Sequence, residues 1–332
     1  LNRAIQLHQS GNLQGARENY HGILAGDPKN SAAHHFLGLL EHQLGNLQEA
    51  LGHMETSLGL DSTQGFFLVN YGNLLKDLGR PVESEKAFSQ ALAMDANDAV
   101  AHYNLGILYQ LWNRLPMAIQ AFEHAVRCQP DFAAAHGKLA AIHLQMNQVE
   151  KAKQAALLMV EKSPNDATGW FHLADCQGRQ DQWAESCQSL ERALQLQPVF
   201  PEATNNLGMA YHKVGKLDEA RQAFLQAISL DPQFADPCVN MGRLSDEAGN
   251  LDDAFRWLVR GLEVDPQNPQ AHFAMGNFLA KIGREKEGAS HLRQAITLKP
   301  DYAEALNNLG NILLSLRQHE EGLDAFQRAI AL

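Results

Sequence analysis

The hydrophobic positions of the chain recur with a period of 34 residues. Within each repeat, positions 4, 7, 8 and 11 form one apolar helical stripe, and positions 20, 24, 27 and 28 form a second. Position 15 is mostly Gly, Asn or Asp, which suits the turn after a first helix. Position 32 is Pro in seven of the nine repeats that reach it, so a second helix ends there. Each repeat therefore predicts two helices joined by a short turn.

The repeats follow one another without insertion or deletion. They occupy residues 1–30 (partial), 31–64, 65–98, 99–132, 133–166, 167–200, 201–234, 235–268, 269–302 and 303–332 (partial). We therefore expect one all-α array over residues 1–332. The chain begins inside a first helix and shows no polar capping helix at its end, so we expect more protein to follow Leu332.

Two positions are small in every repeat. Position 8 is Gly or Ala, and position 20 is Ala, Ser or Gly. Small side chains let two helix backbones approach, so we expect the helices of each hairpin to cross there. One repeat departs from the pattern, since 133–166 has Ala156 at position 24 and Met159 at position 27. This exchange of a large and a small residue keeps the volume, and we interpret it as local repacking.

The combination of a small residue at position 8, Ala at positions 20 and 27 and Pro at position 32 resembles the tetratricopeptide repeat. The resemblance covers the whole chain. It implies an all-α, right-handed superhelical solenoid of antiparallel helix hairpins. It also implies that the first helix of each repeat lines a concave groove that binds a protein or peptide in an extended conformation.

Position 6 lies on a stripe turned away from the core and is Asn in six of ten repeats, although Asn is a mediocre helix former. These groove asparagines are Asn2, Asn70, Asn104, Asn206, Asn240 and Asn308. A carboxamide both donates and accepts, so such a row could hold the backbone of an extended polypeptide. Alternatively, each Asn bonds to the neighbouring repeat or is merely tolerated. The row is similar to the asparagine ladder in the repeat domain of O-linked N-acetylglucosamine transferase-like proteins.

Other residues join these asparagines on the expected groove. Phe66, Val69, Val100, Tyr103 and Ile107 make its earlier part apolar, so they either contact apolar ligand side chains or pack between repeats. The predicted peptide-binding residues are Asn70, Asn104, Asn206, Asn240, Asn308, Phe66, Tyr103, Lys138, His172 and Arg243. No position 5 is Lys or Arg, so the clamp that captures acidic C-termini in related repeats is not expected.

Composition narrows the function further. The net charge of −11 argues against nucleic-acid binding, and no apolar run approaches the ~20 residues of a membrane helix. His34, His102, His136 and His272 share position 4 with Trp170 and are interpreted as replacing part of its ring in packing. Neither His-x-x-x-His nor Cys-x-x-Cys occurs, so zinc lacks its usual ligand spacing and we expect no metal. No phosphate-binding Gly-rich loop or nucleophile elbow is present either, so we expect no cofactor and no catalytic residue in this chain.

The leading hypothesis is a non-enzymatic, cytoplasmic module that recruits substrate polypeptides for a larger protein, such as an O-linked N-acetylglucosamine transferase-like glycosyltransferase. The alternative is a stand-alone scaffold for the assembly of a secretion, pilus or organelle complex. Self-association through exposed terminal repeats is a third hypothesis, because the last helix presents Leu323, Phe326, Ile330 and Leu332. Cytoplasmic location is expected on the base rate for such a chain.

Overall fold

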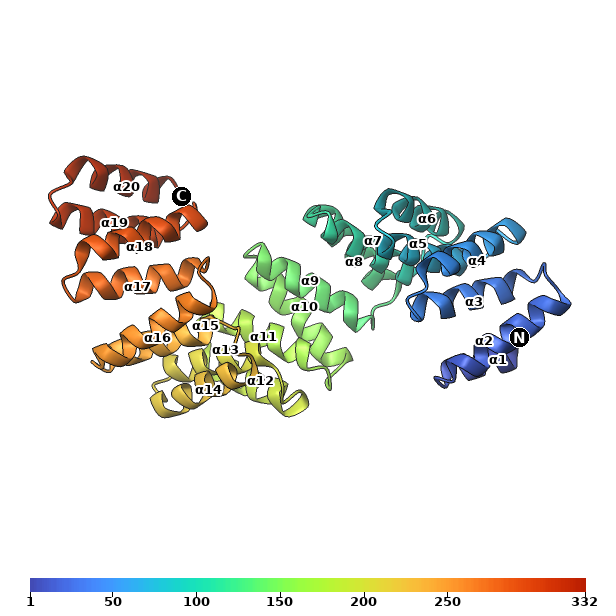
Figure 1. Ribbon diagram of the computed structural model, residues 1–332, viewed down its shortest axis with the longest axis horizontal. Helices are drawn as coiled ribbons and strands as arrows, with labels where there is room; N and C mark the ends of the chain where they lie inside the picture. The colour runs from blue at the N-terminus through green and yellow to red at the C-terminus, as the bar shows by residue number, and fades with distance from the viewer. The chain divides into compact units, whose positions relative to one another are not determined.

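The computed structural model describes residues 1–332 as twenty α-helices and no β-strands (Figure 1). The helices fall into two compact units, Leu1–Lys162 and Ser163–Leu332, called here the N-terminal and C-terminal units. Each unit contains five helical hairpins, in which an odd-numbered first helix packs against the even-numbered second helix that follows it. No helix is both long and apolar enough to cross a lipid bilayer.

The N-terminal unit follows the predicted repeats residue by residue, since α3 and α5 begin where repeats 31–64 and 65–98 begin. Its helices are α1 (Asn2–Gln9), α2 (Leu13–Gly26), α3 (Ser31–Gln43), α4 (Leu47–Leu60), α5 (Gly65–Asp77), α6 (Pro81–Met94), α7 (Ala99–Leu111), α8 (Leu115–Cys128), α9 (Ala133–Gln145) and α10 (Val149–Lys162). First helices of successive repeats also touch, because α5 contacts both α3 and α7.

The C-terminal unit repeats this arrangement. Its helices are α11 (Ala167–Arg179), α12 (Trp183–Leu196), α13 (Pro201–Lys213), α14 (Leu217–Leu230), α15 (Asp236–Glu247), α16 (Leu251–Val264), α17 (Pro269–Lys281), α18 (Glu285–Leu298), α19 (Ala303–Ser315) and α20 (His319–Ala331). Here the first helices α11, α13, α15, α17 and α19 each contact the next one, so they form one continuous face.

The turn inside each hairpin depends on position 15, where the backbone is left-handed in every repeat. Six repeats use Gly, which adopts positive φ at little cost. Asn113, Asn147, Asp181 and Arg317 take the same conformation with φ between 55° and 62°. The turn prediction is therefore confirmed. Arg317 shows that the backbone at position 15 of the repeat is left-handed even when the residue type does not favour positive φ.

The predicted close crossing of each hairpin is also confirmed. A Cβ atom added to Gly208 would lie 2.6 Å from the ring of Phe224, and Ser84 Oγ at position 20 donates to the Gly72 carbonyl at position 8 over 2.7 Å. In repeat 133–166, Met159 is buried and its Sδ would lie 2.7 Å from a Cβ on Gly137. The large side chain at position 27 thus packs against position 5 of the first helix in this repeat, while Ala156 at position 24 is also buried.

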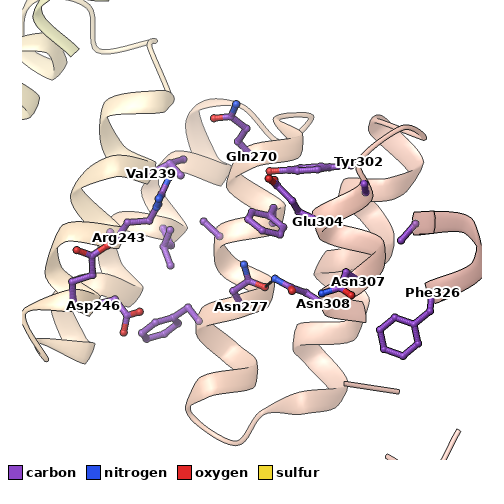
Figure 2. Close-up of a pocket in the computed structure, with 18 of the residues that line it drawn as sticks. Val239, Arg243, Asp246, Gln270, Asn277, Tyr302, Glu304, Asn307, Asn308 and Phe326 are labelled. Carbon is purple, nitrogen blue, oxygen red and sulfur yellow. Dashed lines mark hydrogen bonds between the residues drawn. The ribbon is translucent and has the colours of Figure 1, made fainter. Parts of the chain in front are cut away.

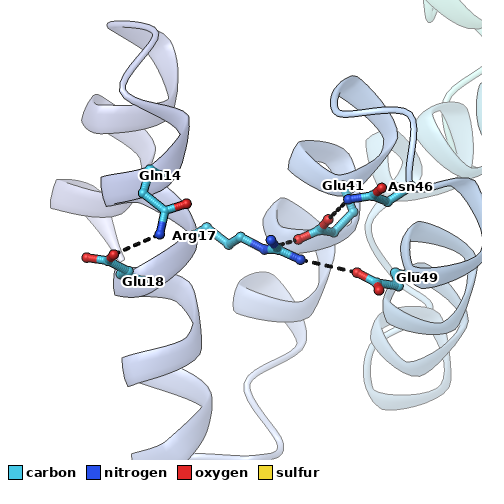
Figure 3. A network of polar contacts seen from close by, with 6 residues as sticks. All are labelled: Gln14, Arg17, Glu18, Glu41, Asn46 and Glu49. Carbon is cyan, nitrogen blue, oxygen red and sulfur yellow. Dashed lines mark hydrogen bonds and ion pairs between the residues drawn. The ribbon is translucent and has the colours of Figure 1, made fainter.

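One polar network differs from the sequence prediction, because Glu41 occupies position 11 of the apolar stripe and is 1% exposed. Arg17 Nε lies 2.7 Å from Glu41 Oε1, and Asn46 Nδ2 donates to Glu41 Oε2 over 2.7 Å (Figure 3). Arg17 also reaches Glu49 at 3.3 Å. Two successive hairpins are therefore joined by an ion pair where the pattern predicts apolar packing.

The position-4 residues link each repeat to the previous one through a hydrogen bond that the sequence did not reveal. Each ring N–H reaches the carbonyl oxygen of the residue six positions earlier, at the end of the previous repeat. The donors are His34, His102, His136 and His272, at 3.0–3.1 Å, and Trp170, at 2.9 Å. Imidazole therefore replaces both the ring and the N–H of the indole.

Candidate functional site

The first-helix face of the C-terminal unit contains a cavity of about 1120 Å³ (Figure 2). Side chains of α15, α17, α19 and α20 supply most of its walls. Its polar and aromatic lining includes Arg243, Asp246, Glu247, Phe273, Asn277, Tyr302, Glu304, Asn307 and Asn308. A cavity of this size exceeds the usual range for small-molecule sites, and can hold several residues of a peptide.

Carboxamides of two successive repeats meet inside the cavity. Asn308 Nδ2 donates to Asn277 Oδ1 over 2.9 Å, and both residues are half-buried (Figure 2). This bond fixes the plane of both amides. It leaves Asn308 Oδ1 and Asn277 Nδ2 without a partner in the chain, so one acceptor and one donor remain for a ligand.

A second contact between carboxamides of successive repeats occurs two repeats earlier. Asn240 Nδ2 donates to Asn205 Oδ1 over 2.9 Å, and Asn205 is 3% exposed. Asn205 Nδ2 in turn lies 3.4 Å from Asn206 Oδ1. These bonds correspond to the alternative that a groove asparagine bonds to the neighbouring repeat, but each uses only part of the carboxamide's capacity.

An aromatic pair adjoins these amides in the cavity. The rings of Phe273 and Tyr302 are 4.9 Å apart, and Lys299 Nζ lies 4.9 Å from the Tyr302 ring centre. Burial, assisted by the neighbouring Glu304 carboxylate, raises the pKa of the Tyr302 hydroxyl. The hydroxyl is therefore protonated at neutral pH and can donate to a ligand acceptor.

The charges of the cavity are only partly neutralised. Asp246 is paired with Lys281 at 2.7 Å, and Glu247 accepts from His212 Nε2 at 2.6 Å. Arg243 and Glu304 make no ion pair within the chain. One cation and one anion are thus available on the walls, which fits the mixed polar surface that the sequence indicates.

On the first-helix face of the N-terminal unit, an imidazole takes the place of the accepting carboxamide and holds a groove asparagine of the next repeat. Asn70 Nδ2 lies 3.0 Å from His35 Nε2, and His35 is 1% exposed. Burial lowers the pKa of His35 to about 4, so at neutral pH this ring is uncharged and accepts the amide hydrogen. The ring stacks on Phe67 at 3.9 Å and meets the Phe66 ring edge-on at 5.3 Å.

Some residues of the predicted apolar patch are exposed to solvent, and others are packed inside the protein. Phe66 and Val100 are exposed at 47% and 48%, whereas Val69 is buried. Tyr103 is half-buried, with its ring 4.9 Å from Phe132 and 5.6 Å from Phe122, and burial raises its pKa. Only part of this patch is therefore free to meet a ligand.

The remaining predicted residues lie on several first helices. Asn104 is half-buried on α7 and makes no side-chain hydrogen bond within the chain, while Lys138 is half-buried on α9. His172 is half-buried on α11, and Arg243 is exposed on α15. Of the ten predicted residues, only Arg243 and Asn308 line the same cavity.

The predicted site residues lack five members of the amide and aromatic network, namely Asn205, Phe273, Asn277, Tyr302 and Glu304. The doublets Asn205–Asn206 and Asn307–Asn308 were visible signals, since a second Asn before the groove position supplies a partner for the next repeat or the cavity wall. Asn277 sits at position 9 and carries no comparable signal.

Two repeat models match the sequence. A family model described as the cilia and flagella-associated protein 70 C-terminal domain matches residues 56–308, and a tetratricopeptide repeat model matches residues 1–64 and 286–332. No curated protein matches the chain.

Similar solved structures share the helical repeat fold. Yeast Tom70 has 12% identity and a TM-score of 0.55, with 100% of this chain and 91% of that chain covered. PilF of Pseudomonas aeruginosa has 17% identity and a TM-score of 0.56, with 67% and 98% covered. YrrB, described as a tetratricopeptide repeat protein with an unusual peptide-binding site, has 20% identity and a TM-score of 0.49, with 55% and 95% covered. These identities establish likeness of fold alone.

Proposed function

The chain belongs to the tetratricopeptide repeat family of the cilia and flagella-associated protein 70 C-terminal domain, and on this premise we propose that its first-helix faces bind extended polypeptides. The observation that carries the proposal is the cavity of the C-terminal unit, where the oriented Asn277–Asn308 pair lies beside the Phe273–Tyr302 rings. The amides supply hydrogen bonds to a peptide backbone. The rings supply apolar surface for a side chain.

Orientation of the amides before binding is central to this mechanism. An Asn side chain that is held by the previous repeat loses little rotamer freedom when a ligand arrives, so less of the binding energy is spent on ordering. The same reasoning extends to Asn240, held by Asn205, and to Asn70, held by His35. Asn104 and Lys138 complete the proposed contact set of the N-terminal unit, and His172 and Asn206 that of the C-terminal unit.

Two biological roles follow from such a face. In the first, the chain is the substrate-recruiting arm of a larger protein. The proposal that this larger protein is a glycosyltransferase rests on the asparagine row alone. In the second, it is an assembly scaffold, which is favoured by the matched family's description as cilia- and flagella-associated. The four cysteines are free thiols, which accords with the proposed cytoplasmic location.

The test begins with selection of peptide ligands from a random, unstructured library on the immobilised full chain. Affinities are then measured by fluorescence anisotropy for wild type, for Asn277→Ala/Asn308→Ala and for Gln222→Ala, an exposed α14 residue outside the cavity. We expect the double variant to weaken binding about 10- to 100-fold, because each lost hydrogen bond is worth about 1 kcal/mol. Gln222→Ala should bind like wild type.

The selected peptides also separate the two roles. Backbone-directed recruitment predicts many unrelated sequences with similar affinities, whereas an assembly scaffold predicts one dominant side-chain pattern. Failure to select any peptide, or equal binding by the cavity variant and wild type, would contradict peptide binding at this cavity.

A further inference from the structure

Two histidine pairs with nearly identical geometry occur on hairpins of the two units. Nδ1 of His34 on α3 lies 3.0 Å from Nδ1 of His53 on α4, with ring centres 5.3 Å apart. In the C-terminal unit, Nδ1 of His272 on α17 lies 3.0 Å from Nδ1 of His291 on α18, with ring centres 5.2 Å apart. Each pair joins position 4 of a repeat to position 23.

The hydrogen bonds define which ring nitrogen carries each proton. His34 Nε2 donates to the Pro28 carbonyl and His272 Nε2 donates to the Pro266 carbonyl, both over 3.1 Å. In a neutral imidazole the other nitrogen then holds a lone pair, so Nδ1 of His34 and of His272 accepts. The Nδ1–H of His53 or His291 is the donor across each pair.

We propose that each pair is a two-histidine chelate for a divalent transition-metal ion of the Zn²⁺, Ni²⁺ and Cu²⁺ class. Such ions bind imidazole nitrogen at about 2.0–2.1 Å. Two nitrogens 3.0 Å apart then subtend about 90° at the ion, the angle between neighbouring ligands in octahedral or square-planar geometry. The ion takes the place of the hydrogen between the rings, and that proton moves to Nε2 of His53 or His291.

The surroundings of the pairs support coordination. The carbonyl bonds of His34 and His272 remain intact when Nδ1 binds an ion, and such bonds to the second ring nitrogen are the usual support of a metal-binding histidine.

Carboxylates lie close to both pairs. Glu287 precedes His291 by four residues on α18, and Glu263, Glu287 and His291 line a cavity of about 360 Å³. Glu49 likewise precedes His53 by four residues on α4. Glu49, Glu41 and His21 are all close enough to His53 to interact with it electrostatically. No three metal-binding side chains converge on one point, so water completes the shell and the ion exchanges readily.

A third pair in the chain provides an internal control. His102 Nε2 donates to the Ala96 carbonyl over 3.1 Å, as in the other two cases. Its partner His124 lies at position 26 instead of 23, and the two rings stack 4.9 Å apart at 18°. This pair has no Nδ1–Nδ1 contact and is not expected to chelate an ion.

The test uses the untagged chain of residues 1–332, titrated at pH 7.5 with Zn²⁺ by calorimetry and with Cu²⁺ by electron paramagnetic resonance. Wild type and His124→Gln should bind two ions per chain, with coupling of Cu²⁺ to two nitrogens. His53→Gln should bind one ion, and His53→Gln/His291→Gln should bind at least tenfold more weakly. Gln was chosen because its amide can still donate to Nδ1 of His34 or His272 and preserve folding, which circular dichroism will check.

Three results would overturn the proposal: no binding by the wild type at 100-fold excess of either ion, equal binding by the double Gln variant, or an equal loss in His124→Gln. The thermal midpoint gives an independent readout, since an ion that binds only the folded chain raises it in proportion to the logarithm of its concentration. This rise should disappear in the double variant and persist in His124→Gln.

Discussion

At the scale of single residues, the hairpin crossing is controlled by the space above position 8. Gly208 faces the ring of Phe224 so closely that a Cβ atom would lie 2.6 Å from it. Ala174 occupies the same register position in another repeat, where Leu190 replaces the aromatic ring. Side-chain size alone does not set this limit, since a Cβ on Gly242 would lie 2.7 Å from Leu258, whereas Ala4 packs in one cluster with Tyr20. The fit of the two facing side chains in each hairpin therefore decides whether position 8 can carry a methyl group.

This geometry predicts opposite effects for two Gly→Ala substitutions. Gly208→Ala should lower the free energy of unfolding by about 1–2 kcal/mol, since overpacking outweighs the gain in helix propensity. Gly52→Ala, inside α4 with no atom within 4 Å of its added Cβ, should raise it by about 1 kcal/mol. Urea unfolding measures both. Equal signs for the two changes would contradict the packing argument.

A double-mutant cycle tests the contact itself. Gly208→Ala/Phe224→Leu recreates the pairing of Ala174 with Leu190 and should cost less than the sum of the two single substitutions. Strict additivity would mean that the ring is not the group that excludes the methyl.

At the scale of helices, consecutive first helices are linked by buried polar contacts. His35 on α3 accepts from Asn70 on α5 and stacks on Phe67, so one imidazole joins two repeats. The depressed pKa of this ring has a consequence for stability. Below pH 6.5 the unfolded chain binds the proton more readily than the folded chain does, because the folded pKa is about 4 and the ordinary value is 6.5.

The chain should therefore lose stability as the pH falls from 6.5 toward 4, by up to roughly 3 kcal/mol from His35 alone. This contribution is fully present above pH 7. His35→Gln keeps an acceptor for Asn70 but cannot take up a proton, so its stability should fall less over this range. Urea unfolding at pH 7 and pH 4.5 compares the two proteins.

The comparison isolates His35, because His53, His124 and His143 also have lowered pKa values but titrate in both proteins. Equal losses in wild type and His35→Gln would show that protonation of this ring is not coupled to unfolding.

At the scale of the whole chain, the 34-residue period predicted nearly all element positions because local packing repeats with the sequence. Gly, Asn and Pro at fixed positions mark turns and helix ends without knowledge of any distant contact. The partnership of Arg17 with Glu41 and that of His34 with His53 depend on rotamers and on the rotation of one helix against another. No short-range pattern encodes these two partnerships, so they emerged only from the structure, whereas the doublets Asn205–Asn206 and Asn307–Asn308 already indicated amide contacts in the sequence.

The same local organisation predicts where the chain can be divided. A repeat protein buries its core between neighbouring hairpins, and each of the two compact units contains complete hairpins with their own buried clusters. Fragments 1–162 and 163–332 should therefore each be helical by circular dichroism and unfold cooperatively in urea.

A cut between residues 180 and 181 separates α11 from α12 and exposes Leu173, Ala174 and Leu190, which the intact hairpin buries. Fragment 181–332 should thus show lower stability than 163–332, although it lacks only 18 residues, and equal stability would mean that α11 contributes nothing to the core.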